Sequence, residues 1–297
     1  MRVLLAPSQT PTNYPKYWEK LEYPLLGSPK LDGIRGMVGE GELVMSRTWK
    51  PIPSYQVQDL FGALPEWVDG ELIEGRVTDG DVYNRTQSYV MSADKEGDLS
   101  YHLFDYARPD LLDAPYVQRL DELRELILPE NVFIVPQTPL NNYEELIEYE
   151  ATQLNLGFEG VMLRTPYGRY KQNRATINEG IIYKLKRFED AEGVVVDYVE
   201  RQKNNNELER DERGYAKRSS SKAGKQAVGT LGKFKVEFQG RVINVGPGHF
   251  THAELQAIWD SRDDYLGLLL KFRYFAHGIK DEPRHARAIG WRDPIDV

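Results

Sequence analysis

The stretch SPKLDGIRG, residues 28–36, places Lys30 directly before a Leu-Asp-Gly turn and Arg35 just beyond it. The preceding run, YPLLG, is apolar. A lysine amine is nucleophilic only after it has lost its proton, and its ordinary pKa is about 10.4. Burial and a neighbouring cation both lower that pKa. We therefore expect Lys30 to be an activated nucleophile and Asp32 to hold a metal ion or a hydroxyl; an ordinary surface Asp-Gly turn is the alternative.

The composition predicts a globular chain. It has 297 residues, 40% of them apolar, which suits one large domain or two ordinary ones. The absence of cysteine excludes disulfides and thiolate metal sites. The apolar run before Pro7 is too short for a signal peptide, so we expect a soluble, cytoplasmic protein without a membrane partner. The net charge of −8 argues mildly against a nucleic-acid partner, but electrostatic footprints are local.

The first two thirds of the chain alternate short β-rich runs with helical patterns. Residues 34–47 predict a β-hairpin that turns at its central glycines. Amphipathic helices are predicted over residues 116–128, with Ile127 on the apolar face, and over residues 142–155. Further strands are predicted over residues 67–75, 101–107, 158–165 and 180–188.

The last third of the chain has a different pattern. One helix is predicted over residues 251–262, with Thr251 as its N-cap and Glu254 at the capping-box position. Several short strands with one inserted helix suit a small β-barrel such as an OB-fold. We therefore predict two domains, residues 1–189 and residues 190–297. The strands of the second are predicted over residues 194–200, 229–238, 241–246 and 268–275.

A long polar segment, residues 201–228, separates the first two strands of the second domain. A loop of that length inside a compact domain is usually functional or disordered. Its first half holds the acidic run ELERDE, residues 207–212. A flexible basic segment can neutralise nucleic-acid phosphates without reading their sequence, and a disordered solvated loop is the alternative. The basic residues of the second half are Arg213, Lys217, Arg218, Lys222 and Lys225.

Three other stretches carry charges on predicted strands. Asp69 and Glu71, in VDGELIEG, are two residues apart and so share a strand face. They repel each other unless a cation lies between them, although a solvated strand face is the alternative. Glu159 stands at the edge of an apolar strand in FEGVMLR. Lys184 and Lys186, in IIYKLKRF, also share one face, and a solvated basic edge is the alternative.

A nucleophilic lysine, several carboxylates and a lysine pair together suit phosphoryl chemistry. Carboxylates can hold Mg²⁺, and lysines can neutralise a triphosphate as charge develops on its leaving group. The sequence contains no GxxxxGK[ST] loop and no protein-kinase HRD or DFG motif. This excludes the P-loop enzymes and the protein kinases.

The chain resembles the covalent nucleotidyltransferases, specifically the ATP-dependent DNA ligases, and most of all their minimal two-domain viral members. The resemblance lies in an ordered series of motifs: KLDGIR, SRT, VDGELIEG, LFDYA, EGVMLR and IYKLKRFEDAEG. The resemblance implies an α+β fold: an adenylation (nucleotidyltransferase) domain of ATP-grasp-like antiparallel sheets with helices, then a β-barrel OB-fold domain. It implies a monomer, in a host-cell cytoplasm if viral, that serves DNA replication, repair or recombination. ATP and Mg²⁺ are the implied cofactors, with Mn²⁺ as an alternative, and nicked duplex DNA is the implied partner.

The resemblance also assigns roles around the nucleotide. Lys30 attacks the α-phosphate of ATP, keeps AMP as a phosphoramidate and passes it to the 5′-phosphate of a nick, which the 3′-hydroxyl then seals. Arg35 and Glu71 contact the ribose. Phe104 stacks on adenine, although a plain core phenylalanine is the alternative, and the backbone near Ser28 reads the exocyclic amine.

The resemblance assigns contacts with the phosphates and the metal ion to other motif residues. By the resemblance Lys184 and Lys186 grip the phosphates and act in catalysis together with Lys30 and Asp32. The carboxylates nearest the metal ion or the reacting hydroxyl are Asp32, Asp69, Glu71 and Glu159.

The resemblance implies DNA contacts in two places and a pyrophosphate-orienting motif in a third. Arg47 and Arg174 fall where the family binds the 5′-phosphate of the nick, and the fork of an arginine suits a phosphate. The basic segment described above corresponds to a latch that closes around the duplex. The C-terminal stretch PRHARAIGWRDPIDV resembles the last family motif, which orients pyrophosphate, with Arg284, Arg287, Arg292 and Asp293 as candidates.

Two alternatives remain open at this point. An RNA ligase or an RNA capping guanylyltransferase shares the KxDG lysine and the OB domain. A non-catalytic OB-fold nucleic-acid binder with a degenerate enzyme domain is the second alternative. His249 and His252, in GHFTH, suggest either a metal pair or, more simply, a turn and a helix cap.

Overall fold

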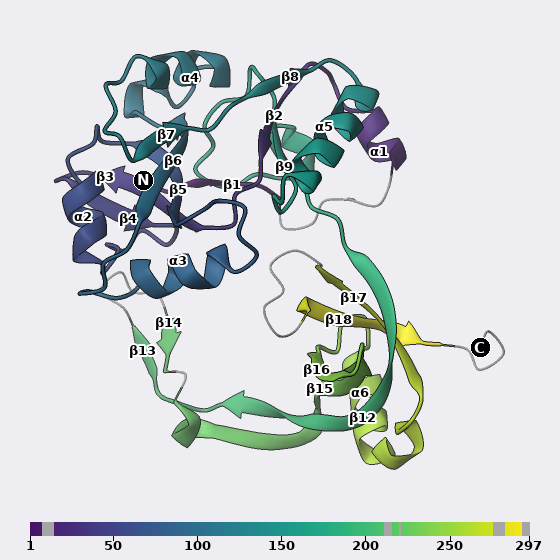
Figure 1. The fold of residues 1–297 in the computed structure, drawn as a ribbon. Helices are drawn as coiled ribbons and strands as arrows, with labels where there is room; N and C mark the ends of the chain where they lie inside the picture. The colour runs from purple at the N-terminus through teal and green to yellow at the C-terminus, as the bar shows by residue number, and fades with distance from the viewer. Residues whose placement is uncertain (8–14, 211–215, 220, 276–282, 293–297) are drawn as a thin grey trace. The chain divides into compact units, whose positions relative to one another are not determined.

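The structure is a computed structural model that describes residues 1–7, 15–210, 216–219, 221–275 and 283–292. The chain divides into two compact units, Met1–Arg187 and Phe188–Val297. Figure 1 shows their strands and helices. No helix among the described residues is long and apolar enough to span a bilayer.

The larger sheet of the first unit has five strands in the order β4-β3-β5-β6-β7, and all neighbours are antiparallel except β6 and β7. The predicted hairpin is confirmed as β3 and β4, and its turn includes Gly41 and Glu42 at positive φ. Strands β5 and β6 confirm two further predictions. The bounds are β3 (Ile34–Gly39), β4 (Leu43–Ser46), β5 (Val68–Glu74), β6 (Leu99–Tyr106) and β7 (Val132–Ile134).

Three helices accompany this sheet. They are α2 (Tyr55–Phe61), α3 (Val82–Val90) and α4 (Tyr116–Arg124), and the sequence patterns had indicated only the third. The predicted extension of α4 to residue 128 is wrong: the helix ends at Arg124 and the side chain of Ile127 is 97% exposed. Pro129 follows, and the residue before a proline avoids helical backbone angles.

The smaller sheet of the first unit is antiparallel, in the order β11-β9-β2-β8. One face packs Leu25, Leu140 and Val161 with Trp18 and Leu146 of two neighbouring helices. The other face presents a row formed by the cross-strand partners Ser28, Met162 and Lys184. The bounds are α1 (Pro15–Glu19), β2 (Leu25–Pro29), β8 (Thr138–Leu140), α5 (Tyr143–Asn155), β9 (Val161–Arg164) and β11 (Ile182–Leu185), and the predicted helix over residues 142–155 is confirmed as α5.

A short parallel pair completes the first unit. Strand β1 (Leu4–Leu5) pairs with β10 (Asn173–Arg174), two residues that lie far away in sequence. Single turns of 3₁₀ helix occur at η1 (Pro109–Leu111) and η2 (Ile177–Glu179). The pairing holds the chain start beside Arg174, one of the predicted phosphate-binding residues.

The second unit is built on one antiparallel sheet in the order β16-β15-β12-β17-β18. An isolated parallel bridge joins Gly246 to Arg287, but the described edge strands β16 and β18 are not otherwise paired, so a closed barrel is not shown. Helix α6 (His252–Asp260) begins at Thr251, whose predicted capping box with Glu254 is confirmed. The strands are β12 (Glu189–Asn204), β15 (Lys225–Phe238), β16 (Arg241–Val245), β17 (Leu269–Phe275) and β18 (Arg284–Trp291), and η4 (Arg262–Tyr265) follows the helix.

The long polar segment is not simply a loop. Strands β12 and β15 run past their predicted ends and pair as far as Asn204 with Lys225. Between them, β13 (Leu208–Arg210) pairs with β14 (Ala216–Arg218), and η3 (Lys222–Gly224) leads into β15. We call β12 to β15 the ribbon. Residues 201–203 of β12 and 225–228 of β15 are exposed, and the sequence of this part of the ribbon lacks the apolar alternation by which strands are recognised.

Candidate active site

A cavity of about 260 Å³ lies in the first unit and is lined from both of its larger sheets. It brings together predicted residues from six separate stretches of the chain. They come from the KLDGIR motif and its flanks, from β5 and β6, from β11, and from the turn and the strand β10 that carry the two predicted phosphate-binding arginines. The predicted residues that line it are Ser28, Lys30, Arg35, Arg47, Glu71, Phe104, Arg174 and Lys184.

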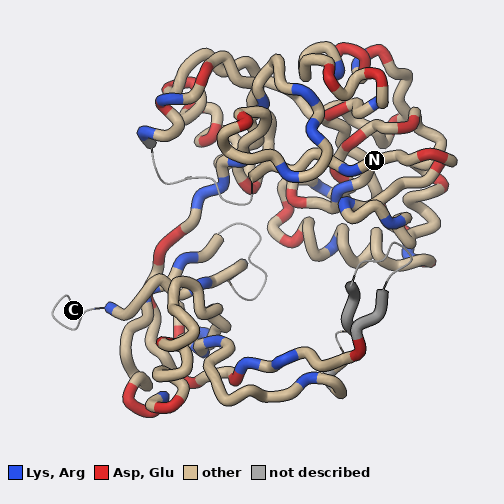
Figure 2. Tube along the Cα trace, turned by 180° about the vertical axis from the view of Figure 1, so that it is seen from behind, with Lys and Arg blue, Asp and Glu red and all other residues tan. Residues whose placement is uncertain are grey.

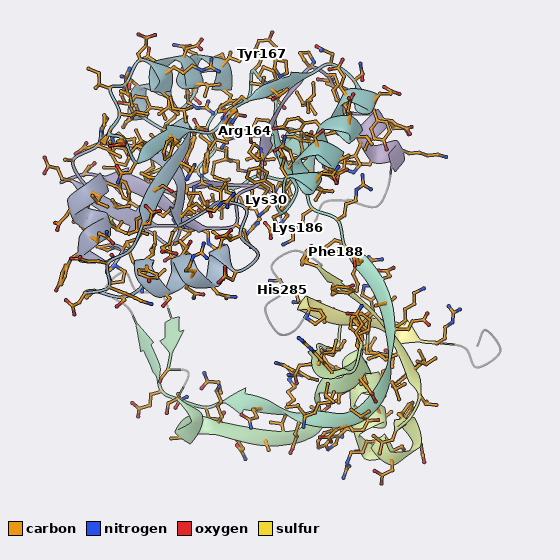
Figure 3. All side chains as sticks on the ribbon, viewed as in Figure 1. Lys30, Arg164, Tyr167, Lys186, Phe188 and His285 are labelled. Carbon is orange, nitrogen blue, oxygen red and sulfur yellow. The ribbon has the colours of Figure 1, made fainter. Side chains whose placement is uncertain are left out.

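Lys30 stands at the end of β2 and shares a carboxylate with a second lysine. Glu159 accepts from Lys30 Nζ through Oε2 and from Lys186 Nζ through Oε1. The backbone N–H of Lys30 also donates to the carbonyl of Gly160, at 2.9 Å. Figure 3 shows Lys30 and Lys186 near each other in the first unit. Two residues that lie 129 and 27 positions from Glu159 in the sequence are therefore joined by one side chain.

The expected lowering of the Lys30 pKa is wrong for this structure. Burial is the largest single effect and does lower it, but the charges of Glu159, Asp32 and Glu71 together raise the pKa of Lys30 above its ordinary value. Burial also raises the pKa of Glu159, but the charges and hydrogen bonds of Lys30 and Lys186 outweigh burial and lower this pKa to about 2. Lys30 is therefore a protonated, ion-paired amine until this arrangement changes.

Arg35 is held by a buried carboxylate. Its Nε and Nη2 donate to Asp69 Oδ1 and Oδ2, at 2.5 and 2.6 Å, and Tyr170 Oη donates to Oδ2 at 2.6 Å. Asp69 is fully buried and is not among the cavity-lining residues. Asp69 thus orients Arg35, whose guanidinium lies 4.4 Å from the centre of the Phe104 ring. A metal-binding role for Asp69 stays a prediction.

Glu71 lines the cavity beside Arg35, its cross-strand partner. Burial raises the pKa of Glu71 to about 7, against the opposing effects of the Arg35 and Lys30 charges. The carboxyl group therefore exchanges its proton near neutral pH. A metal ion or a hydroxyl donor placed beside it would favour the ionised form.

Lys184 is the cavity lysine that stays available for an anion. Burial lowers its pKa first, and the charges of Lys30 and Arg174 lower it further. Within the described residues it forms no ion pair, unlike Lys30 and Lys186. Anionic phosphate oxygens would relieve this repulsion between cations.

Sequence reasoning missed the role of Arg164 and of the carboxylate beside Phe104. Asp105 is fully buried, accepts from Arg119 at 2.8 Å and forms an ion pair with Arg164. Arg164 lines the cavity and lies 5.5 Å from the Phe104 ring centre. Phe104 is therefore flanked by two fixed guanidinium groups. The signal was present in LFDYA and EGVMLR, but nothing local indicated that these two motifs meet.

The structure leaves the predicted metal roles open. Among the described residues no group of three or more His, Asp or Glu side chains could hold a metal ion as placed. His252 begins α6 and lies 3.1 Å from Arg201, which fits the simpler prediction of a helix cap region. The carboxylates of Asp32, Glu71 and Glu159 nonetheless each raise the pKa of Lys30 through their charges.

The predicted DNA-contact residues occur in both units. Arg174 donates to the carbonyl of Ala6 at 2.7 Å and lines the cavity, as does Arg47. In the second unit Lys217 and Arg218 belong to β14, Lys222 to η3 and Lys225 to β15. Figure 2 shows Lys and Arg positions along the part of the ribbon formed by β12 and β15. Arg287 lies in β18, and Arg292 pairs with Glu192 at 3.2 Å. Arg213 and Asp293 lie outside the described residues.

Comparison with known proteins gives a consistent result. The sequence model described as "ATP dependent DNA ligase domain" matches residues 8–186. The DNA ligase of African swine fever virus, isolate Warthog/Namibia, is 24% identical over 290 residues, which are 90% of this chain and 63% of that protein. The DNA ligase of Haemophilus influenzae is 29% identical over 174 residues, 57% of this chain and 60% of that one. This chain thus spans between 45% and 63% of the first curated relatives that it matches.

Solved structures match over nearly the whole chain. The Chlorella virus DNA ligase-adenylate is 32% identical, with a TM-score of 0.54, and the match covers 99% of this chain and 98% of that one. A Lig E DNA ligase structure has a TM-score of 0.71 at 22% identity, covering 98% and 99% of the two chains, and supports the fold alone. Both units therefore have counterparts in solved proteins.

Proposed function

Because the chain belongs to the ATP-dependent DNA ligase family, we propose that it seals nicks between a 5′-phosphate and a 3′-hydroxyl in duplex DNA through an AMP bound to Lys30. One observation carries this proposal. Lys30 shares a cavity with a flanked aromatic ring, Phe104, and with Lys184, a cation that forms no ion pair among the described residues. A purine and a polyphosphate are what such a combination recognises.

The chemical step requires Lys30 to lose its proton. When a triphosphate enters, its oxygens compete with Glu159 for the ammonium of Lys186. Glu159 then loses one of the two cations that lower its pKa and becomes a better proton acceptor for Lys30. The freed amine attacks the α-phosphorus, the nitrogen–phosphorus bond forms, and the bond to the bridging oxygen breaks as pyrophosphate leaves.

The nucleotide is held by groups that are already fixed. Arg35 cannot swing away, because Asp69 binds it through two hydrogen bonds. We infer that Phe104 stacks on adenine, and that Arg35 and Glu71 face the ribose. Fixed partners cost no reorganisation when the substrate binds, which favours reaction over mere binding.

Mg²⁺, or Mn²⁺ in its place, would find oxygen ligands in Asp32, Glu71 and Glu159, whose charges all act on Lys30. The pKa of Glu71 is raised because burial outweighs the charges of Arg35 and Lys30, and a bound cation would favour the ionised carboxylate. The bound ion would supply positive charge to the phosphates during the transfer.

The remaining assignments are part of the same proposal. Residues 1–189 act as the adenylation domain and residues 190–297 as an OB-type domain. The ribbon contacts duplex DNA as a latch, while Arg47 and Arg174 bind the 5′-phosphate of the nick. Arg287, Arg292 and Asp293 orient pyrophosphate. The protein works as a monomer in DNA replication, repair or recombination, in the cytoplasm.

Nick sealing tests the proposal. The substrate is a duplex with one labelled 5′-phosphorylated nick, incubated with ATP and magnesium and with wild type or Lys30→Ala. Lys20→Ala, at an exposed lysine outside the cavity, is the matched control. Sealing by the wild type and by the control, but not by Lys30→Ala, is expected. Joining of RNA or transfer of GMP, with DNA left open, would favour an RNA ligase or a capping enzyme. Binding without reaction would favour a non-catalytic OB-fold protein.

A further inference from the structure

The pairing of β12 with β15 is interrupted by a wide bulge in the second unit. After the pair of Glu200 with Leu231, three residues of β15, 228–230, lie opposite the single residue Arg201 before the ladder resumes. Gly229, at the centre of the three, has a φ of 64°, a left-handed conformation that glycine adopts without steric cost. A bulge bends and twists the strand that carries it. This bulge therefore sets the direction of the strands beyond it, residues 202–227, which we call the outer ribbon.

Side chains from two elements hold both backbone polar groups of Gly229. The Oε1 atom of Glu200, in β12, accepts from the N–H of Gly229 at 2.7 Å. The Nε2 atom of Gln256, in α6, donates to the Gly229 carbonyl at 2.8 Å. Figure 1 shows α6 close to β15. A residue in a bulge loses its place in the strand ladder, and these two hydrogen bonds take the place of the ladder bonds.

Helix α6 also holds the strand on the other side of the bulge. The Nη1 atom of Arg201 lies 3.1 Å from Nδ1 of His252. A guanidinium can only donate, so the imidazole nitrogen is the acceptor. His252 and Gln256 are four residues apart on α6 and therefore share one face of the helix. That one face thus binds both strands at the point where the outer ribbon begins.

The helix that carries these two side chains is fixed by other residues. Leu255 and Ile258 of α6 are buried in the apolar core of the second unit. His252 and Gln256 are exposed, so they are not part of that packing. Their hydrogen bonds to the ribbon can therefore be removed while the core that supports α6 is kept.

The described part of the outer ribbon is tied together by its own side chains. The Nδ2 atom of Asn206 donates to the carbonyls of Ser219 and Ser221, at 2.9 and 3.0 Å. The Nδ2 atom of Asn204 also donates to the carbonyl of Ser219, at 2.9 Å. These bonds join the end of β12 to the segment between β14 and β15. The outer ribbon thus turns as one piece, and its direction is decided at the bulge.

We propose that His252 and Gln256 are positioning residues that fix the direction of the outer ribbon, so that it meets duplex DNA in a preformed arrangement. This inference rests on the proposed function, because it takes the ribbon to contact DNA. A ribbon that is already aimed loses little freedom when the duplex binds. A ribbon released at its base is correctly aimed only part of the time, and the apparent affinity falls by that fraction.

The first test is binding of a fluorescent nicked duplex to the full chain by anisotropy, without ATP. His252→Ala and Gln256→Ala each remove one hydrogen bond, and alanine favours the helix. We expect each variant to bind the duplex about fivefold more weakly, and the double variant more weakly still. AMP uptake from ATP, which uses the cavity of the first unit, should keep its wild-type rate. Gln87→Ala, the same change at an exposed position of α3, is the matched control.

Two further measurements separate positioning from a general structural role. In the protein without DNA, the backbone amides of residues 202–204 and 225–227 should exchange hydrogen faster in the double variant, whereas those of β16 should not change. His252→Asn keeps an acceptor close to the position of Nδ1 and should bind the duplex better than His252→Ala.

Unchanged duplex binding by the double variant would overturn the inference. So would a His252→Asn variant as weak as His252→Ala, because the acceptor would then be irrelevant. Failure of the proposed function looks different, since wild type would then bind no nicked duplex. In that case faster exchange across the outer ribbon of the double variant would still support the clamp by α6, and unchanged exchange would refute it.

Discussion

Replacement of Asp69 by asparagine tests the buried clamp that holds Arg35. Asp69 is fully buried, and only 15% of the Arg35 side chain is exposed, so solvent screens the pair little. The asparagine amide would place its own donors against an arginine that can only donate. Breaking a buried pair by removing one partner costs about 3–5 kcal/mol. For a unit of this size that lowers the melting temperature by at least about 6 °C.

The assay is thermal and urea unfolding of the full chain, with AMP uptake measured on the same samples below the melting range. Asp110→Asn is the matched control, because Arg108 also binds Asp110 through two contacts, of 2.7 and 3.0 Å, but on the surface. That variant should melt like the wild type. AMP uptake should fall in Asp69→Asn alone, since Arg35 would no longer be fixed beside Phe104. If Asp69→Asn melted like the wild type, the clamp would not be a main support of the site.

Two further predictions concern the same cavity. In Glu159→Gln the pKa of Lys30 should fall, because the largest effect that raises it is removed. The rise of AMP uptake with pH should therefore begin at a lower pH than in the wild type. An unchanged or alkaline-shifted profile in a stopped-flow pH series would contradict the ion-pair account. Phe104→Ala should weaken nucleotide binding by about tenfold or more, because stacking on the base is lost. Phe133→Ala, which changes an exposed ring outside the cavity, should leave the affinity unchanged. Equal affinities of the two variants in calorimetry would show that Phe104 does not stack on the base.

The sequence predicted the site residues better than their electrostatic state. Lys30, Glu71 and Phe104 stand in short motifs whose local pattern already fixes a turn or a strand face, and the structure places all three in one cavity. The pKa of Lys30 depends on Glu159, which lies 129 residues away. No local pattern could indicate that this carboxylate, together with Asp32 and Glu71, would outweigh the effect of burial on the pKa of Lys30.

The same reasoning separates the predicted elements from the missed ones. The hairpin β3–β4 was predictable from its turn glycines, and helix α6 from its capping box. The outer strands of the ribbon were not predicted because their sequence carries no apolar alternation. The role of Asp105 was not predicted, because its partners come from elsewhere in the chain. Arg119 lies in a helix and Arg164 in a strand, and their ion pairs fix Asp105 beside Phe104.

The most direct test of the central claim follows one AMP from protein to DNA. The protein is first incubated with magnesium and ATP labelled at the α-phosphate, then freed of nucleotide, and the adduct is mapped by peptide mass spectrometry. Nicked duplex is then added without ATP. The account predicts label on Lys30 alone, and one sealed nick for each AMP released. Label on another residue, or label that stays on the protein while nicks remain open, would contradict it.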